Sequence, residues 1–251
     1  MFGQIIKTAL TVGALASVFL FAAHMVKTSP LIVHAEVYEG AGPSHAPETA
    51  TPAGHAHEAA APAEGAKAEA EEWGPADGFE RSFYTFLADL LTSCGFAFLL
   101  VAAIAMSGRN VDWRSGMVWG LCGFAAFFAA PSLGLAPELP GMQAADLHAR
   151  QIWWVSTVVL TAGGLALLFL SKKGLYMAIG ALLILTPHLI GAPAHQVQPG
   201  ALPAELAAEF VAATMVISGL FWLLLGGLSG HFYGRYASDV DGEIGEAELN
   251  G

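Results

Sequence analysis

Histidine and carboxylate side chains are the groups in this sequence that could do chemistry, and most of them lie between or near the ends of long apolar runs. Imidazole nitrogen and carboxylate oxygen together suit divalent transition metals such as cobalt, nickel and zinc. A closed structural metal site would show four ligands at defined spacing, and these residues do not have that spacing. The pattern therefore predicts a surface that binds a metal ion only in passing. The candidate metal ligands are Glu36, Glu39, His55, His57, Asp89, Glu138, Asp146, His148 and His188.

Asp89 is the candidate that lies deepest in an apolar run. It lies about two helical turns, or roughly 9 Å, from the outer end of the run 83–106. A carboxylate at this depth is costly and generally faces a bundle interior or a water-filled cavity. Asp89 is therefore a candidate for the path of a cation. Pairing with Arg81, or with Ser and Thr hydroxyls, is the alternative.

His188 follows a proline at the end of another apolar run, in the stretch LLILTPHLIGAPAH (182–195). Pro187 removes a helical hydrogen bond and leaves the carbonyl near Leu183 free. Such broken helix ends can line a cavity or coordinate a cation. The alternative is a kinked helix with an interfacial histidine.

Two further candidate groups also have structural alternatives. Asp146 can serve as a helix N-cap. The His-, Glu-, Ala- and Pro-rich stretch that contains His55 and His57 is either a low-affinity metal-gathering tether or a solvated spacer. The sequence leaves both choices open.

The elements that must position these residues are membrane helices. Of 251 residues, 55% are hydrophobic and 12% charged, whereas soluble domains are about 25% charged. Apolar runs of about 20 residues predict transmembrane helices, and these runs lack the alternation of barrel strands. We therefore predict an all-α polytopic membrane bundle of about six transmembrane helices, near 5–26, 83–106, 115–134, 152–170, 174–191 and 210–232.

Four regions follow from this reading. We expect a transmembrane helix over 1–34, an exoplasmic and largely disordered loop over 35–82, a five-helix bundle over 83–232 and an acidic cytoplasmic tail over 233–251. Low apolar content predicts the disorder of the loop.

The first segment has an alternative interpretation as a cleaved secretory signal, which would leave five spans. Val33-His34-Ala35 resembles a small-residue cleavage site. However, the apolar run 8–23 exceeds the usual length of about 7–15 residues. Ala9, Gly13 and Ser17 also repeat small residues at a helix-packing interval, so we expect a retained helix.

Basic residues in short loops predict the orientation, because they stay on the cytoplasmic side. Six spans place both termini in the cytoplasm and the His-rich loop outside. Gly116/Gly120 and Gly226/Gly230 have GxxxG spacing, which predicts close helix packing. The residues expected on the cytoplasmic side are Lys7, Arg109, Arg114, Lys172, Lys173 and Arg235.

Several function classes are excluded by charge and motif. The net charge of -11 argues against nucleic-acid binding, which depends on neutralising phosphates. The sequence has no P-loop, HExxH, CxxCH or GxSxG motif. We therefore expect a non-enzyme with no permanently bound cofactor.

Several long blocks resemble the CbtA-type predicted cobalt transporter subunits of bacteria. They are AEVYE (35–39), EEWGPADGFERSFYTFLADLL (71–91), GFAAFFAAPSLGLAPELPGMQAADLHARQIWW (123–154), TPHLIGAP (186–193) and ELAAEFVAATMVISGLFWLLLGGLSG (205–230). Residues in these blocks are preferred as ligands over His55 and His57. The family is usually described with five spans, where this sequence predicts six.

The resemblance implies a multi-pass protein of the bacterial inner membrane that acts in cobalt uptake linked to cobalamin synthesis. It also implies a small partner, CbtB, with one transmembrane helix and a terminal histidine motif.

The sequence thus predicts a membrane subunit of a divalent-metal uptake transporter. It would gather Co²⁺, or alternatively Ni²⁺, at an exoplasmic His and carboxylate surface and pass it to a site near Asp89 and His188. Two other functions stay open. One is a non-transporting metal-binding scaffold or sensor, and the other is a haem-binding electron-transfer subunit with His24 and His188 as axial ligands.

Overall fold

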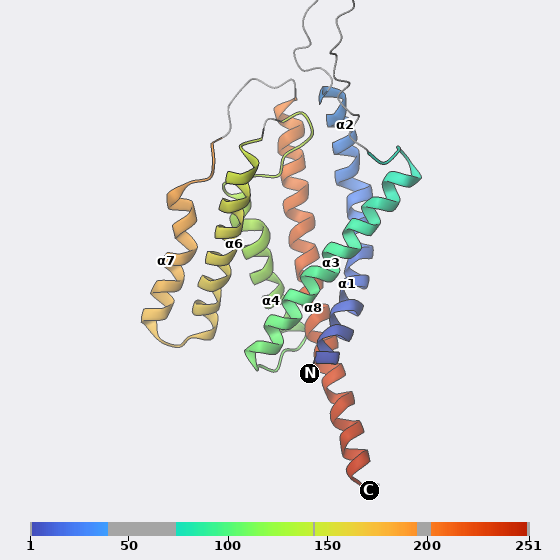
Figure 1. Cartoon of the computed structure of the whole chain (residues 1–251), viewed down its shortest axis with the longest axis vertical. Coiled ribbons are helices and arrows are strands. Elements are labelled where there is room, and N and C mark those ends of the chain that lie inside the picture. Colours follow the sequence, from blue (N-terminus) through green and yellow to red (C-terminus); the bar gives the residue numbers. More distant parts are fainter. Residues whose placement is uncertain (1, 40–73, 143, 195–201, 250–251) are drawn as a thin grey trace, which may run out of the picture.

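The computed structural model describes residues 2–39, 74–142, 144–194 and 202–249, and the regular elements in this part of the chain are all helices (Figure 1). Five helical stretches are long and apolar enough to cross a membrane, and one further apolar helix has 17 residues. The predicted all-α membrane bundle is confirmed. The elements are α1 (Phe2–Ala23), the π-helix η1 (His24–Thr28), α2 (Ser29–Glu39), α3 (Phe79–Ser107), α4 (Trp113–Phe124), the π-helix η2 (Ala125–Ala129), α5 (Ala130–Ser132), α6 (Leu147–Leu170), α7 (Gly174–Ile190) and α8 (Ala204–Leu249).

The helices extend beyond several predicted boundaries. Helix α2 continues to Glu39 and α3 begins at Phe79, so both ends of the predicted 35–82 loop are helical. Helix α8 continues through the predicted tail to Leu249. The predicted boundaries lie where the apolar runs end, but the hydrogen bonds within a helix do not require apolar side chains, so the helices continue into polar sequence.

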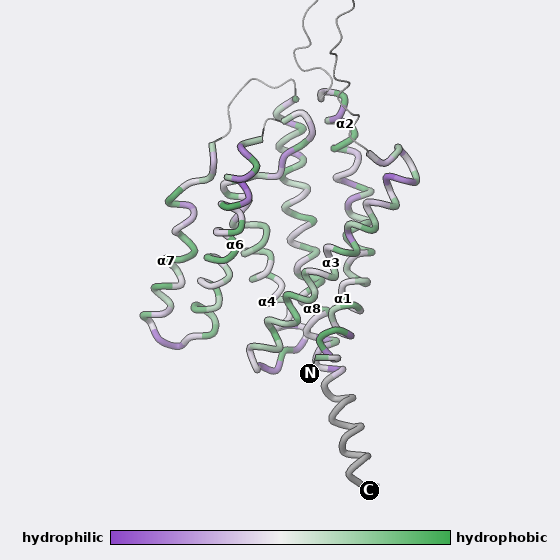
Figure 2. The backbone as a smooth tube through the Cα atoms, in the orientation of Figure 1, coloured by the Kyte–Doolittle hydropathy of each residue, from purple (hydrophilic) through white to green (hydrophobic). Residues whose placement is uncertain are grey.

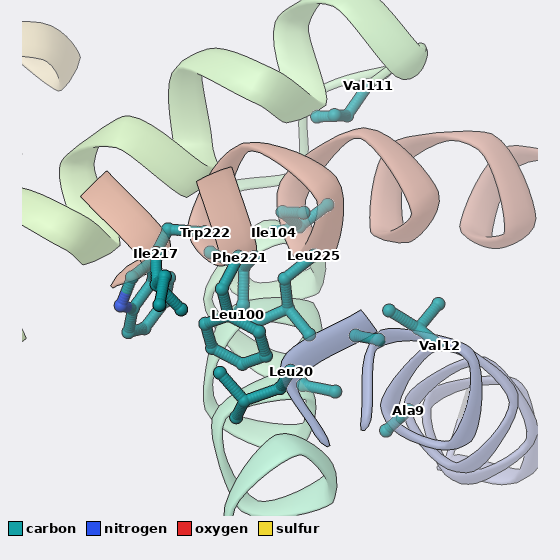
Figure 3. Close-up of a cluster of buried hydrophobic side chains, with 12 residues drawn as sticks. Ala9, Val12, Leu20, Leu100, Ile104, Val111, Ile217, Phe221, Trp222 and Leu225 are labelled. Atoms are coloured by element: carbon teal, nitrogen blue, oxygen red, sulfur yellow. The ribbon is translucent and has the colours of Figure 1, made fainter. Parts of the chain in front are cut away.

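Three antiparallel helix pairs make up the bundle, namely α1 with α3, α4 with α8, and α6 with α7. Helix α1 also packs against α8, so the first two pairs form a common core. Figure 3 shows side chains of α1, α3 and α8 converging there, including Val12, Ile104, Leu225 and Trp222. The α6–α7 pair lies to one side of this core (Figure 1).

Helix α1 contributes an entire buried face to the core. Ala9, Val12 and Ala16 are fully buried. A Cβ atom on Gly13 would lie 2.6 Å from the Cα atom of Cys94 in α3, so the two backbones are in close contact. Helix α1 is therefore an integral part of the core in this structure.

The two GxxxG segments, each of which predicted close helix packing, pack directly against each other in the structure. A Cβ atom on Gly226 of α8 would lie 2.3 Å from the carbonyl oxygen of Gly116 and 2.7 Å from the Cα atom of Gly120, both in α4. A Cβ atom on Gly230 would lie 2.2 Å from the Asp112 carbonyl oxygen. Only glycine permits this approach of the two backbones.

We expect Gly226→Ala to destabilise the protein by about 1–3 kcal/mol, because the added methyl group forces the α4 and α8 backbones apart. Thermal unfolding in detergent measures the effect. Gly163→Ala in α6 is the matched control, since nothing lies within 4 Å of its added Cβ atom. Equal unfolding temperatures for the two variants would contradict the packing described here.

One residue separates the end of each π-helix from a proline. The Ser29 N–H donates to the His24 carbonyl, five residues earlier, and Pro30 follows. The Ala130 N–H donates to the Ala125 carbonyl, and Pro131 follows. Proline lacks an N–H and clashes with the carbonyl four residues before it, which explains the local widening. Such widened turns often occur at functional sites, and η1 begins at a histidine.

Candidate functional site

The candidate residues in the described part of the chain lie at one end of the bundle. The C-terminal ends of α2 and α7 and the N-terminal ends of α3, α6 and α8 meet there, at the top of Figure 1. The turns around 108–112 and 171–173 lie at the opposite end. Figure 2 shows hydrophilic segments at both ends and mostly hydrophobic helices between them. The candidates therefore lie toward the same end of the bundle.

A cavity of about 460 Å³ lies between the first helical stretch, α3 and α8. Its lining includes polar side chains from all three, namely His24, Thr28, Arg81, Tyr84, Thr85 and Thr214. Three of the hydroxyls donate to carbonyls of their own helices, Thr28 to His24, Thr85 to Arg81 and Thr214 to Phe210. Their oxygen lone pairs therefore stay available to accept hydrogen bonds or to face a cation.

Asp89 lies beside this cavity and is paired with His24. The Nδ1 atom of His24 is 3.0 Å from Oδ1 and 3.1 Å from Oδ2 of Asp89. Asp89 is only 6% exposed, so the carboxylate faces the bundle interior, as its predicted depth indicated. The alternative pairing with Arg81 is wrong.

Arg81 instead binds two other carboxylates at the mouth of the cavity. Both guanidinium Nη atoms contact the carboxylate of Glu36 in α2, and Nη1 is also 3.0 Å from Oδ1 of Asp77. The Nζ atom of Lys27 is 2.5 Å from Oε1 of Glu209. These pairs tie α2 to α3 and η1 to α8. Glu36, a predicted ligand, is therefore held by Arg81.

The second group of predicted ligands lies around the start of α6. Glu138 forms an ion pair with Arg150, with an N–O distance of 3.0 Å. Asp146 caps α6, since its carboxylate accepts a hydrogen bond from the Ala149 N–H at 2.9 Å. His148 is exposed. The N-cap interpretation of Asp146 is thus confirmed.

We expect Asp146→Ala to destabilise the protein by about 1 kcal/mol, because the first turn of α6 loses its cap. Asp146→Ser keeps a capping oxygen without the charge, so its thermal unfolding temperature should return close to that of the wild type. If the serine variant is as unstable as the alanine variant, the cap is not what Asp146 contributes.

His188 lies in a different part of the molecule from Asp89. Its ring contacts Trp153 of α6 edge-on, with the ring centroids 6.3 Å apart. Helix α7 stands on the opposite side of the bundle from α1 and α3 (Figure 1). The structure therefore does not bring His188 into one site with Asp89. It also does not bring His188 and His24 together as axial ligands of one haem.

Among the residues that the structure describes, no three His, Cys, Asp or Glu side chains come together as a metal site. His55 and His57 lie outside the described residues, and only the backbone of Glu39 is described. The sequence does not predict the pair that the structure assembles, His24 with Asp89. It indicates only that His24 lies near the outer end of the first apolar run.

Comparisons with known proteins add one match. The model of a family described as "Probable cobalt transporter subunit (CbtA)" matches residues 2–234, nearly the whole chain. No curated protein and no solved structure matches the chain.

Proposed function

The chain belongs to the CbtA family of probable cobalt transporter subunits, and from this premise we propose that it carries Co²⁺ inward across a bacterial inner membrane. The observation that carries the proposal is Asp89, a buried carboxylate within a membrane-spanning helix and beside a cavity. Intramembrane carboxylates commonly mark ion pathways.

Basic residues support the proposed orientation. Arg109 and the Lys172–Lys173 pair lie in short turns at the end away from the cavity, and such residues favour the cytoplasm. We therefore place the cavity, the His-rich loop and the N-terminal end of α8 on the exoplasmic side. Both chain termini are then cytoplasmic.

The first helical stretch is longer than the hydrocarbon core is thick, so its outer end and the cavity beside it can lie outside the hydrocarbon. The first helical stretch has 37 residues over Phe2–Tyr38, about 55 Å at 1.5 Å per residue, whereas the hydrocarbon core is about 30 Å thick. The outer part of α2, with Glu36, then stands at or beyond the headgroups. The cavity lies below it, where water and a hydrated cation can enter.

The transported cations first collect at the exoplasmic loops. Glu138, Asp146, His148 and the loop residues His55 and His57 raise the local cation concentration through weak, shared contacts. The ion then enters the cavity and reaches Asp89. Since the chain has no nucleotide-binding motif, we assign the driving force to the membrane potential, which contributes about 2.3 kcal/mol per charge per 100 mV.

A subunit acts with other chains, and we propose a small CbtB-like protein with one transmembrane helix as the partner. Both proteins are then needed for uptake. The chain itself holds no resident cofactor in this proposal, and Co²⁺, with Ni²⁺ as the competing cation, is its substrate.

The test is radiolabelled cobalt uptake in cells that lack other cobalt importers. We expect uptake when the chain and the small partner are expressed together, and competition by nickel. Cells with the partner alone are the control. Absence of uptake, with both proteins present in the membrane, would favour a non-transporting metal-binding scaffold.

A further inference from the structure

The His24–Asp89 pair combines the two ligand types that a borderline divalent metal prefers, in a buried position. Asp89 is more than nine-tenths buried, and His24 lies in the cavity lining. A buried carboxylate requires a hydrogen-bond donor or a cation beside it. The imidazole supplies this contact in the structure, and a metal ion would supply it when present.

We propose that His24 and Asp89 form a transit site for one partly hydrated divalent transition-metal ion, a site that rests on the proposed transport function. The two side chains provide one nitrogen and one oxygen ligand. Water molecules in the cavity fill the remaining positions.

The separation of the two side chains fits neighbouring positions of an octahedral ion. Metal–nitrogen and metal–oxygen bonds are about 2.1 Å long, so two ligands at right angles lie roughly 3.0 Å apart. The Nδ1 atom of His24 lies 3.0 Å from Oδ1 of Asp89. For Nδ1 to bind the ion, it must give up the proton that it donates to Asp89, so that the ring carries its one proton on Nε2, and the imidazole must turn its Nδ1 lone pair toward the ion.

The cavity has room for the rest of the hydration shell. Four water molecules occupy about 120 Å³ at roughly 30 Å³ each, well within the cavity of about 460 Å³. Thr28, Thr85 and Thr214 line the same cavity, and each carries a hydroxyl oxygen. They can accept hydrogen bonds from metal-bound water, which keeps the shell ordered without further protein ligands.

Carboxylates outnumber cationic side chains in the ion pairs around the cavity. The carboxylates of Glu36, Asp77, Asp89 and Glu209 are linked through ion pairs to Arg81, Lys27 and His24. With a neutral imidazole, four carboxylates against two cations leave a net charge of −2. This excess of carboxylates favours the entry of a cation into the cavity.

Two protein ligands suit passage better than storage. Conduction requires binding that is strong enough for entry and weak enough for release. The absence of a third His, Cys, Asp or Glu ligand beside the pair, among the residues described, keeps the affinity low. The π-turn at His24 also interrupts the regular helix at this point.

The test is Co²⁺ binding to the purified full-length chain, carrying a tag without histidine and with His45, His55 and His57 replaced by alanine. Equilibrium binding counts bound ions. Cobalt-edge X-ray absorption counts the light ligands at about 2.1 Å and detects an imidazole ring by its outer-shell scattering. We expect six nitrogen or oxygen ligands and one imidazole at this site.

His24→Ala should abolish one equivalent of bound Co²⁺ together with the imidazole signal, and Asp89→Asn should weaken binding at least tenfold. His24→Gln, which can still bond to Asp89, provides a second variant if the alanine variant unfolds. His188→Ala is the control, since His188 lies near the same end of the bundle but beside Trp153. It should leave both readouts unchanged.

The results distinguish failure of the proposed binding site from failure of the proposed transport function. Binding that is absent, or indifferent to His24 and Asp89, overturns the site even if the wild type transports cobalt. Binding that depends on both residues, in a protein that supports no uptake, supports the site and overturns the transport function.

Discussion

Asp89→Asn is expected to lower the rate of cobalt uptake at least tenfold, at normal abundance in the membrane. Asparagine keeps the size of the side chain and a hydrogen bond to His24, so the fold should persist. The variant removes one negative charge in a region of low dielectric, where such a charge contributes most to holding a cation. A tenfold loss corresponds to about 1.4 kcal/mol.

Asp77→Asn is the matched control for this prediction. Asp77 is paired with a cationic side chain, Arg81, and its own side chain is 92% exposed at the mouth of the cavity. We expect its uptake rate to stay within about twofold of the wild type, since exposed ion pairs contribute little. Wild-type uptake in Asp89→Asn would remove Asp89 from the path.

Trp222→Ala should cause the largest loss of stability. Trp222 of α8 is 3% exposed. Its ring centroid lies 4.9 Å from that of Phe96 in α3, and its ring is stacked on Phe127 in η2 with a centroid distance of 5.6 Å. It also lies against Gly123 of α4. Truncation should lower the free energy of unfolding by about 3 kcal/mol, the lower end of the range for buried Trp, because lipid also solvates apolar groups.

Thermal unfolding and membrane abundance measure this effect, and Trp113→Ala is the control. Trp113 is 50% exposed at the start of α4. Its loss should change the unfolding temperature little. Similar losses in the two variants would show that Trp222 does not join these helices.

The features predicted correctly from the sequence are those that depend on local composition and spacing. Long apolar runs gave the helices, because hydrocarbon demands internal pairing of every backbone group. The spacing of Gly116 and Gly120 predicted a close helix contact, and the structure supplied Gly226 and Gly230 as its partners. The depth of Asp89 predicted a buried carboxylate.

The sequence did not predict which residue would meet Asp89. Hydropathy gives the depth of a residue in the membrane but not the direction in which it faces. His24 and Asp89 lie 65 residues apart, so their contact depends on how α1 and α3 pack. The π-turn after His24 also shifts the face of every later residue in the same helical stretch.

Pro30 and Pro131 were signals that could have been used. Each stands inside a helical run, and each is preceded by a π-helix in the structure. Pro187 also lies inside a helical run and made His188 a candidate ligand, but it lies in the last turn of α7. There the helix ends within a turn, and no widened segment forms.

Blocking the cavity from outside tests whether cobalt passes through it to Asp89. Thr85→Cys, made with Cys94 and Cys122 replaced by alanine, places one thiol in the lining. Ala144→Cys, at an exposed position on the same end, is the control. We predict that a membrane-impermeant thiol reagent stops cobalt uptake in the first variant and leaves uptake in the second variant unchanged. Full labelling of the thiol introduced in the cavity, with unchanged uptake, would contradict it.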